Sequence, residues 1–158
     1  MHIYILRHGD ASSNSRYSDS DRPLTDLGMR QAALAGALLQ RMNTVIDAAI
    51  SSPLKRAQDT ASIVLSSTDK RLISFSELLI NGSDPQHLLN QLDKLRESSV
   101  LLIGHEPYLS ELISLLIGGN KKVEIEMRKC SLALVNISNP IHQGTGVLKF
   151  LIPVETLA

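Results

Sequence analysis

Two short apolar runs, far apart in the chain, are each followed closely by a histidine. Ile3–Leu6 is followed by Arg7-His8-Gly9, and Val100–Ile103 is followed by Gly104-His105. Apolar runs of this length indicate buried strands of a parallel sheet. The carboxyl ends of parallel strands share one edge, where α/β proteins bind their ligands. The sequence therefore predicts that two imidazoles and a guanidinium meet at one sheet edge, a set that suits an anion and best a phosphoryl group.

Strands and helices alternate along most of the chain. Thr25 is expected to cap the first helix, and Ser52 with Pro53 to open the second. Alternation as far as residue 118 predicts an α/β fold, namely a single-domain three-layer α/β/α sandwich with a mostly parallel sheet and an antiparallel edge. The predicted strands are Ile3–Leu6, Val45–Ile50, Arg71–Phe75, Val100–Ile103, Val123–Met127, Leu132–Ile137 and Val147–Ile152, and the predicted helices run from Asp26 to about Arg41, from Pro53 through Val64, from Pro85 through Leu95 and from Pro107 to Gly118.

The composition restricts the classes of function. The 158 residues suit one domain, and with 3% aromatic residues and no tryptophan the core must be aliphatic. The 16 basic and 16 acidic residues cancel, so nucleic acid and membranes are not expected partners, and an anion site must be local. The single cysteine, Cys130, excludes an intramolecular disulfide, and no apolar stretch approaches the ~20 residues that span a bilayer. No signal peptide is recognised, so a cytoplasmic location is expected.

His8 is the candidate nucleophile. A neutral imidazole attacks phosphorus well, and a histidine with the ordinary pKa of about 6.5 is mostly neutral in the cytoplasm. Attack would form a phosphohistidine and divide one difficult displacement into two steps. The other ring nitrogen needs an acceptor that fixes the tautomer, and a backbone carbonyl could serve. Gly9 is expected to let the backbone turn sharply and approach a ligand.

Arg7, Arg56 and His105 are the candidate phosphate-binding residues. Arg7 offers a planar fork of donors that matches phosphate oxygens. Arg56 lies in the first turn of a predicted helix, and its side chain should lean toward the helix N-terminus, where free N–H groups already favour an anion. His105, when protonated, would stabilise charge on the phosphoryl oxygens in the transition state.

Four ordered blocks of sequence resemble the histidine phosphatase superfamily. Their order and spacing cover residues 1 to about 118. The short chain and the compact stretch between Ala61 and Val100 resemble the SixA branch, which lacks the long helical insertion of the phosphoglycerate mutases. The blocks are Leu6-Arg7-His8-Gly9-Asp10-Ala11, Arg22-Pro23-Leu24-Thr25-Asp26-Leu27-Gly28 with Gln31-Ala32, Ser51-Ser52-Pro53-Leu54-Lys55-Arg56-Ala57 with Thr60-Ala61, and Gly104-His105-Glu106-Pro107.

The resemblance implies one histidine phosphatase domain over residues 1–158, with a phosphoglycerate mutase-like fold. It implies a phosphatase that removes phosphate from phosphohistidine on histidine-containing phosphotransfer domains. His8 would be the nucleophile, and Arg7, Arg56 and His105 would form the phosphate pocket. The expected partners are therefore a phosphorylated protein and inorganic phosphate or another anion in the site. The resemblance also implies that no metal and no organic cofactor takes part.

The same resemblance adds two further candidates. Mutase-type relatives use a carboxylic acid to protonate the leaving oxygen, and Glu77, after the predicted strand Arg71–Phe75, is the candidate general acid. Asn14 is the candidate for a phosphate-contacting asparagine. A phosphohistidine substrate would tolerate a missing acid, because imidazole leaves more readily than an alkoxide. Asp10 and Glu106 would repel a phosphate, so they are expected to support the site from behind or to face solvent.

Two other functions remain open at this stage. One is a phosphatase of a small phosphoester; a chain without a large lid leaves its pocket open, which favours a protein substrate instead. A mutase must hold its substrate away from water, which fits such a chain less well. The other is a non-catalytic phosphate-binding module, which would need the arginines but not the nucleophile His8.

Overall fold

The two apolar runs that lead to the histidines are neighbouring parallel strands at the centre of the sheet. In the computed structural model, which describes residues 1–68 and 72–157, β1 (His2–Arg7) pairs with β4 (Ser99–Gly104) along its whole length. Arg7 lies opposite Gly104, so the two strands end together. His8 and His105 therefore leave the sheet side by side, as the sequence predicts.

The other strands complete a mixed sheet in the order β3-β2-β4-β1-β5-β6. On one side of β4 lie β2 (Ala48–Ser51) and the short β3 (Ser74–Phe75), both parallel to it. On the other side of β1 lie β5 (Leu132–Asn136) and then β6 (Val147–Ile152), each antiparallel to its inner neighbour. The predicted fold class is confirmed, with the antiparallel pairing confined to the chain's last strands.

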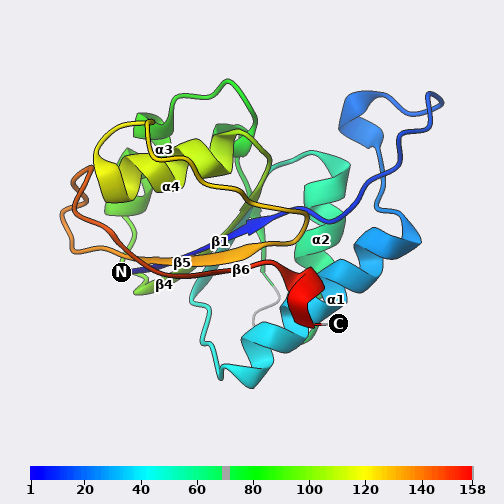
Figure 1. Ribbon diagram of the computed structural model, residues 1–158, viewed down its shortest axis with the longest axis horizontal. Coiled ribbons are helices and arrows are strands. Elements are labelled where there is room, and N and C mark those ends of the chain that lie inside the picture. Colours follow the sequence, from blue (N-terminus) through cyan, green and yellow to red (C-terminus); the bar gives the residue numbers. More distant parts are fainter. Residues whose placement is uncertain (69–71, 158) are drawn as a thin grey trace.

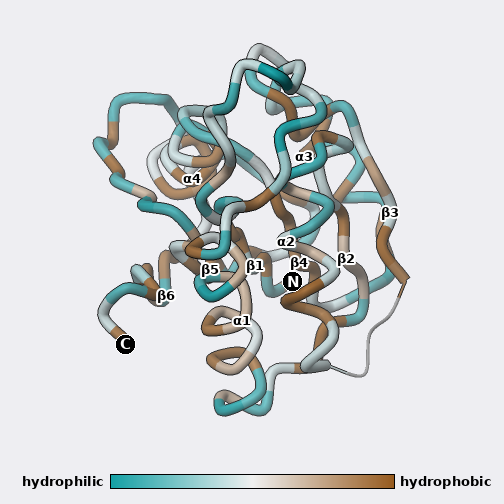
Figure 2. The backbone as a smooth tube through the Cα atoms, turned by 90° about the vertical axis from the view of Figure 1, so that its right-hand side faces the viewer, coloured by the Kyte–Doolittle hydropathy of each residue, from teal (hydrophilic) through white to brown (hydrophobic). Residues whose placement is uncertain are grey.

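Helices cover both faces of this sheet and make the molecule three layers deep (Figure 1). α1 (Asp26–Arg41) and α2 (Lys55–Ser66) pack on one face, and α3 (Pro85–Asp93) and α4 (Tyr108–Gly118) on the other. Figure 2 shows the sheet running across the molecule, with α3 and α4 above it and α1 below it. Three short 3-10 turns connect these elements: η1 (Asp19–Asp21), η2 (Glu77–Leu79) and η3 (Val154–Leu157).

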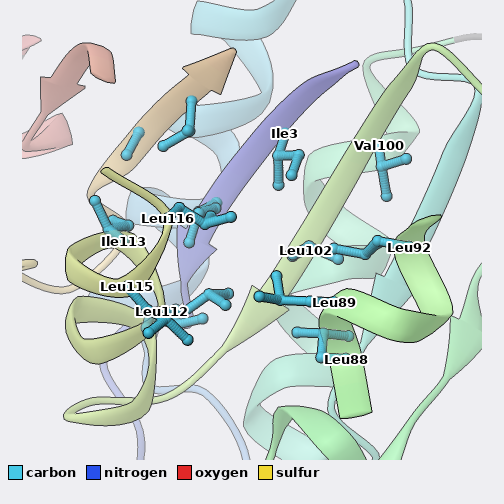
Figure 3. Close-up of a cluster of buried hydrophobic side chains, with 14 of the residues drawn as sticks. Ile3, Leu88, Leu89, Leu92, Val100, Leu102, Leu112, Ile113, Leu115 and Leu116 are labelled. Carbon is cyan, nitrogen blue, oxygen red and sulfur yellow. The ribbon is translucent and has the colours of Figure 1, made fainter. Parts of the chain in front are cut away.

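The strand pleat divides the core into two aliphatic clusters. Along β1, Ile3 and Ile5 face α3 and α4, whereas Tyr4 and Leu6 face α1 and α2, because successive side chains point to opposite faces. The α3–α4 cluster is built almost entirely from leucine, isoleucine and valine (Figure 3). The central strands are buried on both faces, which holds the strand ends, and the residues that follow them, rigid.

The capping signals define the ends of two helices. The hydroxyl of Thr25 accepts a hydrogen bond from the Gly28 N–H at 3.1 Å, which confirms Thr25 as the cap of α1. Gly119 ends α4 in the left-handed conformation with φ of 71°, the conformation in which glycine avoids a steric penalty. No helix of the described residues is long and apolar enough to cross a lipid bilayer.

The predicted strand Val123–Met127 is wrong, because this segment is irregular. The alternation holds only in its second half, since Ile125 and Met127 pack against the core but Val123 is exposed. The segment cannot pair with β1, because β1 is already paired on both sides by β4 and β5. The segment instead crosses the end of β1, and its backbone bonds to side chains.

Three other predicted boundaries need correction. The strand predicted from Val45 begins only at Ala48, and Val45 is exposed to solvent. Of the predicted strand Arg71–Phe75 only Ser74 and Phe75 form a strand, and Arg71 lies outside the described residues. The second helix begins at Lys55 and not at Pro53, because the hydroxyl of Ser52 is held by a residue of the neighbouring strand end, as described below.

Candidate active site

The structure brings the predicted residues Arg7, His8, Arg56 and His105 to one edge of the sheet. Arg7 ends β1 and His8 follows it, His105 follows β4, and Arg56 lies in the first turn of α2. The imidazole rings of His8 and His105 are 5.0 Å apart between centroids. His8, Arg56 and His105 are buried. These four positions therefore form one site.

A backbone carbonyl fixes the orientation of the His8 ring. Nδ1 of His8 lies 2.6 Å from the carbonyl oxygen of Gly9, and a carbonyl can only accept, so Nδ1 carries the proton and donates it. Nε2 is then the unprotonated nitrogen, with its lone pair free. This is the tautomer that a histidine nucleophile needs, and it agrees with the sequence-based expectation of a carbonyl partner.

A serine sets the orientation of His105. The hydroxyl oxygen of Ser52 lies 2.7 Å from His105 Nε2 and also accepts a hydrogen bond from the N–H of Leu54 at 3.3 Å. A hydroxyl can accept from Leu54 and donate its own hydrogen to Nε2, and with this assignment the ring proton of His105 lies on Nδ1. His105 Nδ1 is buried and has no hydrogen-bond partner within the described residues.

The two arginines are only partly satisfied by the protein. Arg7 donates from one terminal nitrogen to the carbonyl oxygen of Met127 at 2.7 Å, and Arg56 donates to the backbone oxygen of Asp19 at 2.6 Å. Nε of each arginine is buried without a partner among the described residues. Together with His105 Nδ1, these nitrogens are hydrogen-bonding groups that the described residues leave unsatisfied.

Burial keeps both histidines neutral. The pKa of His8 is lowered to about 2, chiefly by burial and by the nearby charge of Lys129, and more weakly by His105 and Arg56. The hydrogen bond to Gly9 opposes this shift. Burial and the charge of Arg56 lower the pKa of His105 to about 4. Neutrality suits His8 as a nucleophile. Burial favours a neutral ring with one N–H for His105 as well, and its role as a protonated group in the transition state stays a prediction.

Three charged residues near the site were not among the sequence-based candidates. Asp19 accepts from Arg56 at 3.3 Å and forms an ion pair with Arg22 at 2.9 Å. Partial burial alone would raise the pKa of Asp19, but the charges of Arg56 and Arg22 outweigh it and lower the pKa. Lys129 acts electrostatically on both histidines. Asp19 and Lys129 lie in irregular segments without a motif, whereas Arg22 stands in one of the blocks that carry the family resemblance.

Gly9 has a different role from the one expected. Its φ is not positive, so no special turn requires it. A Cβ at Gly9 would lie 2.6 Å from the carbonyl oxygen of Gly28, and a Cβ at Gly28 would overlap the Asp10 backbone. The two glycines let α1 pack directly on the segment that carries His8. The Gly9 N–H also donates to the hydroxyl of Thr60 in α2 at 3.1 Å.

The acidic candidates lie away from the imidazoles or are engaged elsewhere. The carboxylate of Asp10 accepts from the Thr25 hydroxyl at 2.7 Å, and that of Glu106 accepts from Ser110 at the start of α4. Both therefore support local structure, as expected. Glu77 is exposed in η2, and no contact joins it to the four site residues within the described part of the chain. Its role as a general acid stays a prediction.

Asn14 also stays a prediction. Its side chain is exposed in the β1–α1 loop, where its oxygen accepts a hydrogen bond from the backbone N–H of Arg16 at 2.9 Å. The described residues contain no group of three or more histidine, cysteine or acidic side chains arranged to hold a metal ion.

The geometry defines a class of protein: an α/β protein with a histidine-containing anion site at the carboxyl edge of a parallel sheet. A sequence model of the histidine phosphatase superfamily (branch 1) matches residues 3–79, a stretch that contains Arg7, His8 and Arg56. The solved structure of the protein histidine phosphatase SixA complexed with tungstate superposes on this chain with a TM-score of 0.91 and 26% identity, covering 100% of both chains. Over residues 3–79 the chain is similar to the histidine phosphatase superfamily, and like SixA it carries no large insertion.

Other relatives widen the range of chemistry. An uncharacterized protein of a Picosynechococcus species is 29% identical over 84% of this chain and 82% of its own length. A probable phosphoglycerate mutase, GpmB, of Yersinia pestis is 27% identical over 92% of this chain and 89% of its own length. Similarity to this superfamily thus implies phosphatase or mutase activity.

Proposed function

We propose that the protein removes phosphate from phosphohistidine on a partner protein, through a covalent intermediate on His8. The observation that carries this proposal is the convergence of four residues at one sheet edge, where the ring centroids of His8 and His105 lie 5.0 Å apart and Arg7 and Arg56 supply positive charge. A phosphoryl group would meet there the free Nε2 of His8 and the charges that its oxygens need.

The reaction follows from this arrangement in two steps. In the first, Nε2 of His8 forms a bond to phosphorus while the phosphorus–nitrogen bond of the substrate breaks. The substrate ring, protonated on its other nitrogen, takes the electron pair of that bond and leaves as neutral imidazole. In the second, a water oxygen attacks phosphorus, the bond to Nε2 breaks, and inorganic phosphate is released with the proton of the water passed on to solvent. Arg7, Arg56 and His105 stabilise the charge on the three equatorial oxygens in both steps.

Two features support a phosphohistidine protein as the substrate. An imidazole leaving group needs little protonation, which fits a site where Glu77 is exposed and the carboxylates of Asp10 and Glu106 are bonded elsewhere. The superposed SixA structure, which is that of a protein histidine phosphatase, binds tungstate, an oxyanion of similar shape to phosphate.

The test is trapping of the phosphoenzyme. Wild type, His8→Asn and the control His87→Asn, whose histidine is exposed on α3, are mixed with a ³²P-labelled phosphohistidine protein and quenched within milliseconds to seconds. We expect label that is acid-labile and base-stable in wild type and in His87→Asn, and none in His8→Asn. Label in His8→Asn would refute His8 as the nucleophile.

The same assay separates the other functions. Rapid labelling from phosphoserine, 3-phosphoglycerate or a sugar phosphate, without labelling from the phosphohistidine protein, would replace the proposed substrate with a small phosphoester, a result that the GpmB similarity makes worth testing. Phosphate binding without any trapped phosphoenzyme would indicate a non-catalytic binding module.

A further inference from the structure

The irregular segment before β5 is fixed to the end of β1 by three hydrogen bonds. The carbonyl oxygen of Met127 accepts from the Arg7 guanidinium at 2.7 Å, the N–H of Cys130 donates to the carbonyl oxygen of His8 at 3.3 Å, and the N–H of Arg7 donates to the carbonyl oxygen of Ser131 at 3.2 Å. These bonds fix the backbone both before and after residue 129. The position of Lys129 is therefore set by the same backbone that positions Arg7 and His8.

A left-handed residue shapes this turn. Cys130 has φ of 55°, a conformation that a residue with a Cβ adopts only where its surroundings impose it, and its side chain is buried. Cys130 packs into the α1–α2 cluster, and its left-handed backbone fixes the turn that carries Lys129.

The ammonium of Lys129 has no protein partner. Within the described residues it makes no hydrogen bond and no ion pair, although it is partly buried. Burial and the charges of Arg7, Arg22 and Arg56 lower its pKa, against the attraction of Asp10. A half-buried cation held among other cations is unfavourable unless an anion joins them.

The neighbouring Arg128 shows the contrast. Its guanidinium is exposed and lies 3.2 Å from Glu126 and 3.7 Å from Glu155, so its charge is balanced at the surface. Two consecutive basic residues therefore have opposite environments. One forms ordinary surface ion pairs, and the other lies in the turn bonded to Arg7 and His8, without a carboxylate in contact among the described residues.

We propose that Lys129 is a further substrate-binding residue, whose ammonium donates hydrogen bonds to the oxygens of the phosphoryl group held at His8. The inference rests on the anion site of the proposed function and adds to it a cation that comes from outside the sequence blocks of the family resemblance. Lysine suits this role because its three donors rotate on a flexible stem and can follow the oxygens as phosphorus moves toward Nε2.

The experiment measures the binding of inorganic phosphate by titration calorimetry at low ionic strength, in a buffer free of other polyvalent anions. The variants are Lys129→Met, Lys129→Arg and the matched control Arg128→Met, which removes one positive charge from the same turn. We expect Lys129→Met to weaken phosphate binding roughly tenfold to a hundredfold, the range for one charge-assisted hydrogen bond. Lys129→Arg should recover most of that loss, and Arg128→Met should stay within about twofold of wild type, as a rim charge does.

A thermal melt without phosphate separates a binding role from a folding role. Lys129→Met should melt no lower than wild type, because the removed charge is surrounded by other cations. Unchanged phosphate affinity in Lys129→Met, or an equal loss in Arg128→Met, would overturn the inference. The calorimetry uses no substrate, so the two proposals can fail separately. If Lys129→Met loses phosphate affinity but the wild type does not turn over phosphohistidine, the proposed function is refuted and the inference stands. A wild type that does not bind phosphate would refute both.

Discussion

The neutral state of the two buried imidazoles predicts a steep loss of stability in mild acid. The pKa of His8 is lowered to about 2 and that of His105 to about 4, chiefly by burial, whereas both are close to 6.5 in the unfolded chain. Below pH 6.5 the unfolded state binds protons that the folded state does not bind. Stability is therefore complete above that pH and falls as the pH drops toward the folded-state pKa.

The size of this effect follows from the shifts. Between pH 7.5 and pH 5, each imidazole removes about 2 kcal/mol from the free energy of unfolding, and the pair about 4 kcal/mol. That is a large share of the roughly 5–15 kcal/mol that stabilises a typical domain. The window stays above the ordinary pKa range of exposed carboxyl groups, so the histidines should account for most of the change.

The assay is urea unfolding at pH 7.5, 6.0 and 5.0 in a buffer without phosphate, because a bound anion would raise both pKa values. His8→Gln should lose about half of the pH dependence, roughly 2 kcal/mol. His87→Gln, which removes an exposed histidine and keeps both buried rings, should show the full dependence. If His8→Gln kept the wild-type pH dependence, the argument that burial holds the nucleophile neutral would be wrong.

Three further predictions follow from the packing and the site. Gly28→Ala should destabilise the protein by about 3 kcal/mol, visible as a lower Tm, because its Cβ would overlap the backbone of Asp10. Leu102→Ala, on fully buried β4, should cost about 2–5 kcal/mol in urea unfolding. Ser52→Ala should lower kcat roughly tenfold by freeing the His105 ring, while Ser52→Thr keeps the hydroxyl and most of the activity; equal activity of both variants would contradict the assigned bond.

The sequence was sufficient to predict the elements that depend on local pattern. Alternation of apolar runs with capped helices predicted the parallel strands and the face-covering helices, because buried strands and capped helices each have a local signature. The shared edge for His8 and His105 followed from parallel pairing alone. The carbonyl partner of the His8 ring was expected because a nucleophilic imidazole requires one fixed tautomer.

The features that the sequence did not reveal depend on contacts between distant segments. Whether Val123–Met127 could pair with β1, whose end it crosses, depended on the neighbours of β1, which only the complete pairing order decides. Gly9 was expected to serve the ligand, but its reason is Gly28, 19 positions away in the chain and in direct backbone contact. Lys129 approaches His8 through a turn whose left-handed residue is a cysteine, which carries no turn signal.

The charge balance of the site connects these observations. The chain as a whole is neutral, yet four cations act on one another around His8, namely Arg7, Arg22, Arg56 and Lys129, against the two carboxylates of Asp10 and Asp19. A phosphoryl dianion carries about the charge that would balance this local excess, and it would enter a site whose two imidazoles are neutral. The same excess opposes protonation of His8, so the cations that would bind the substrate also keep the nucleophile's lone pair available.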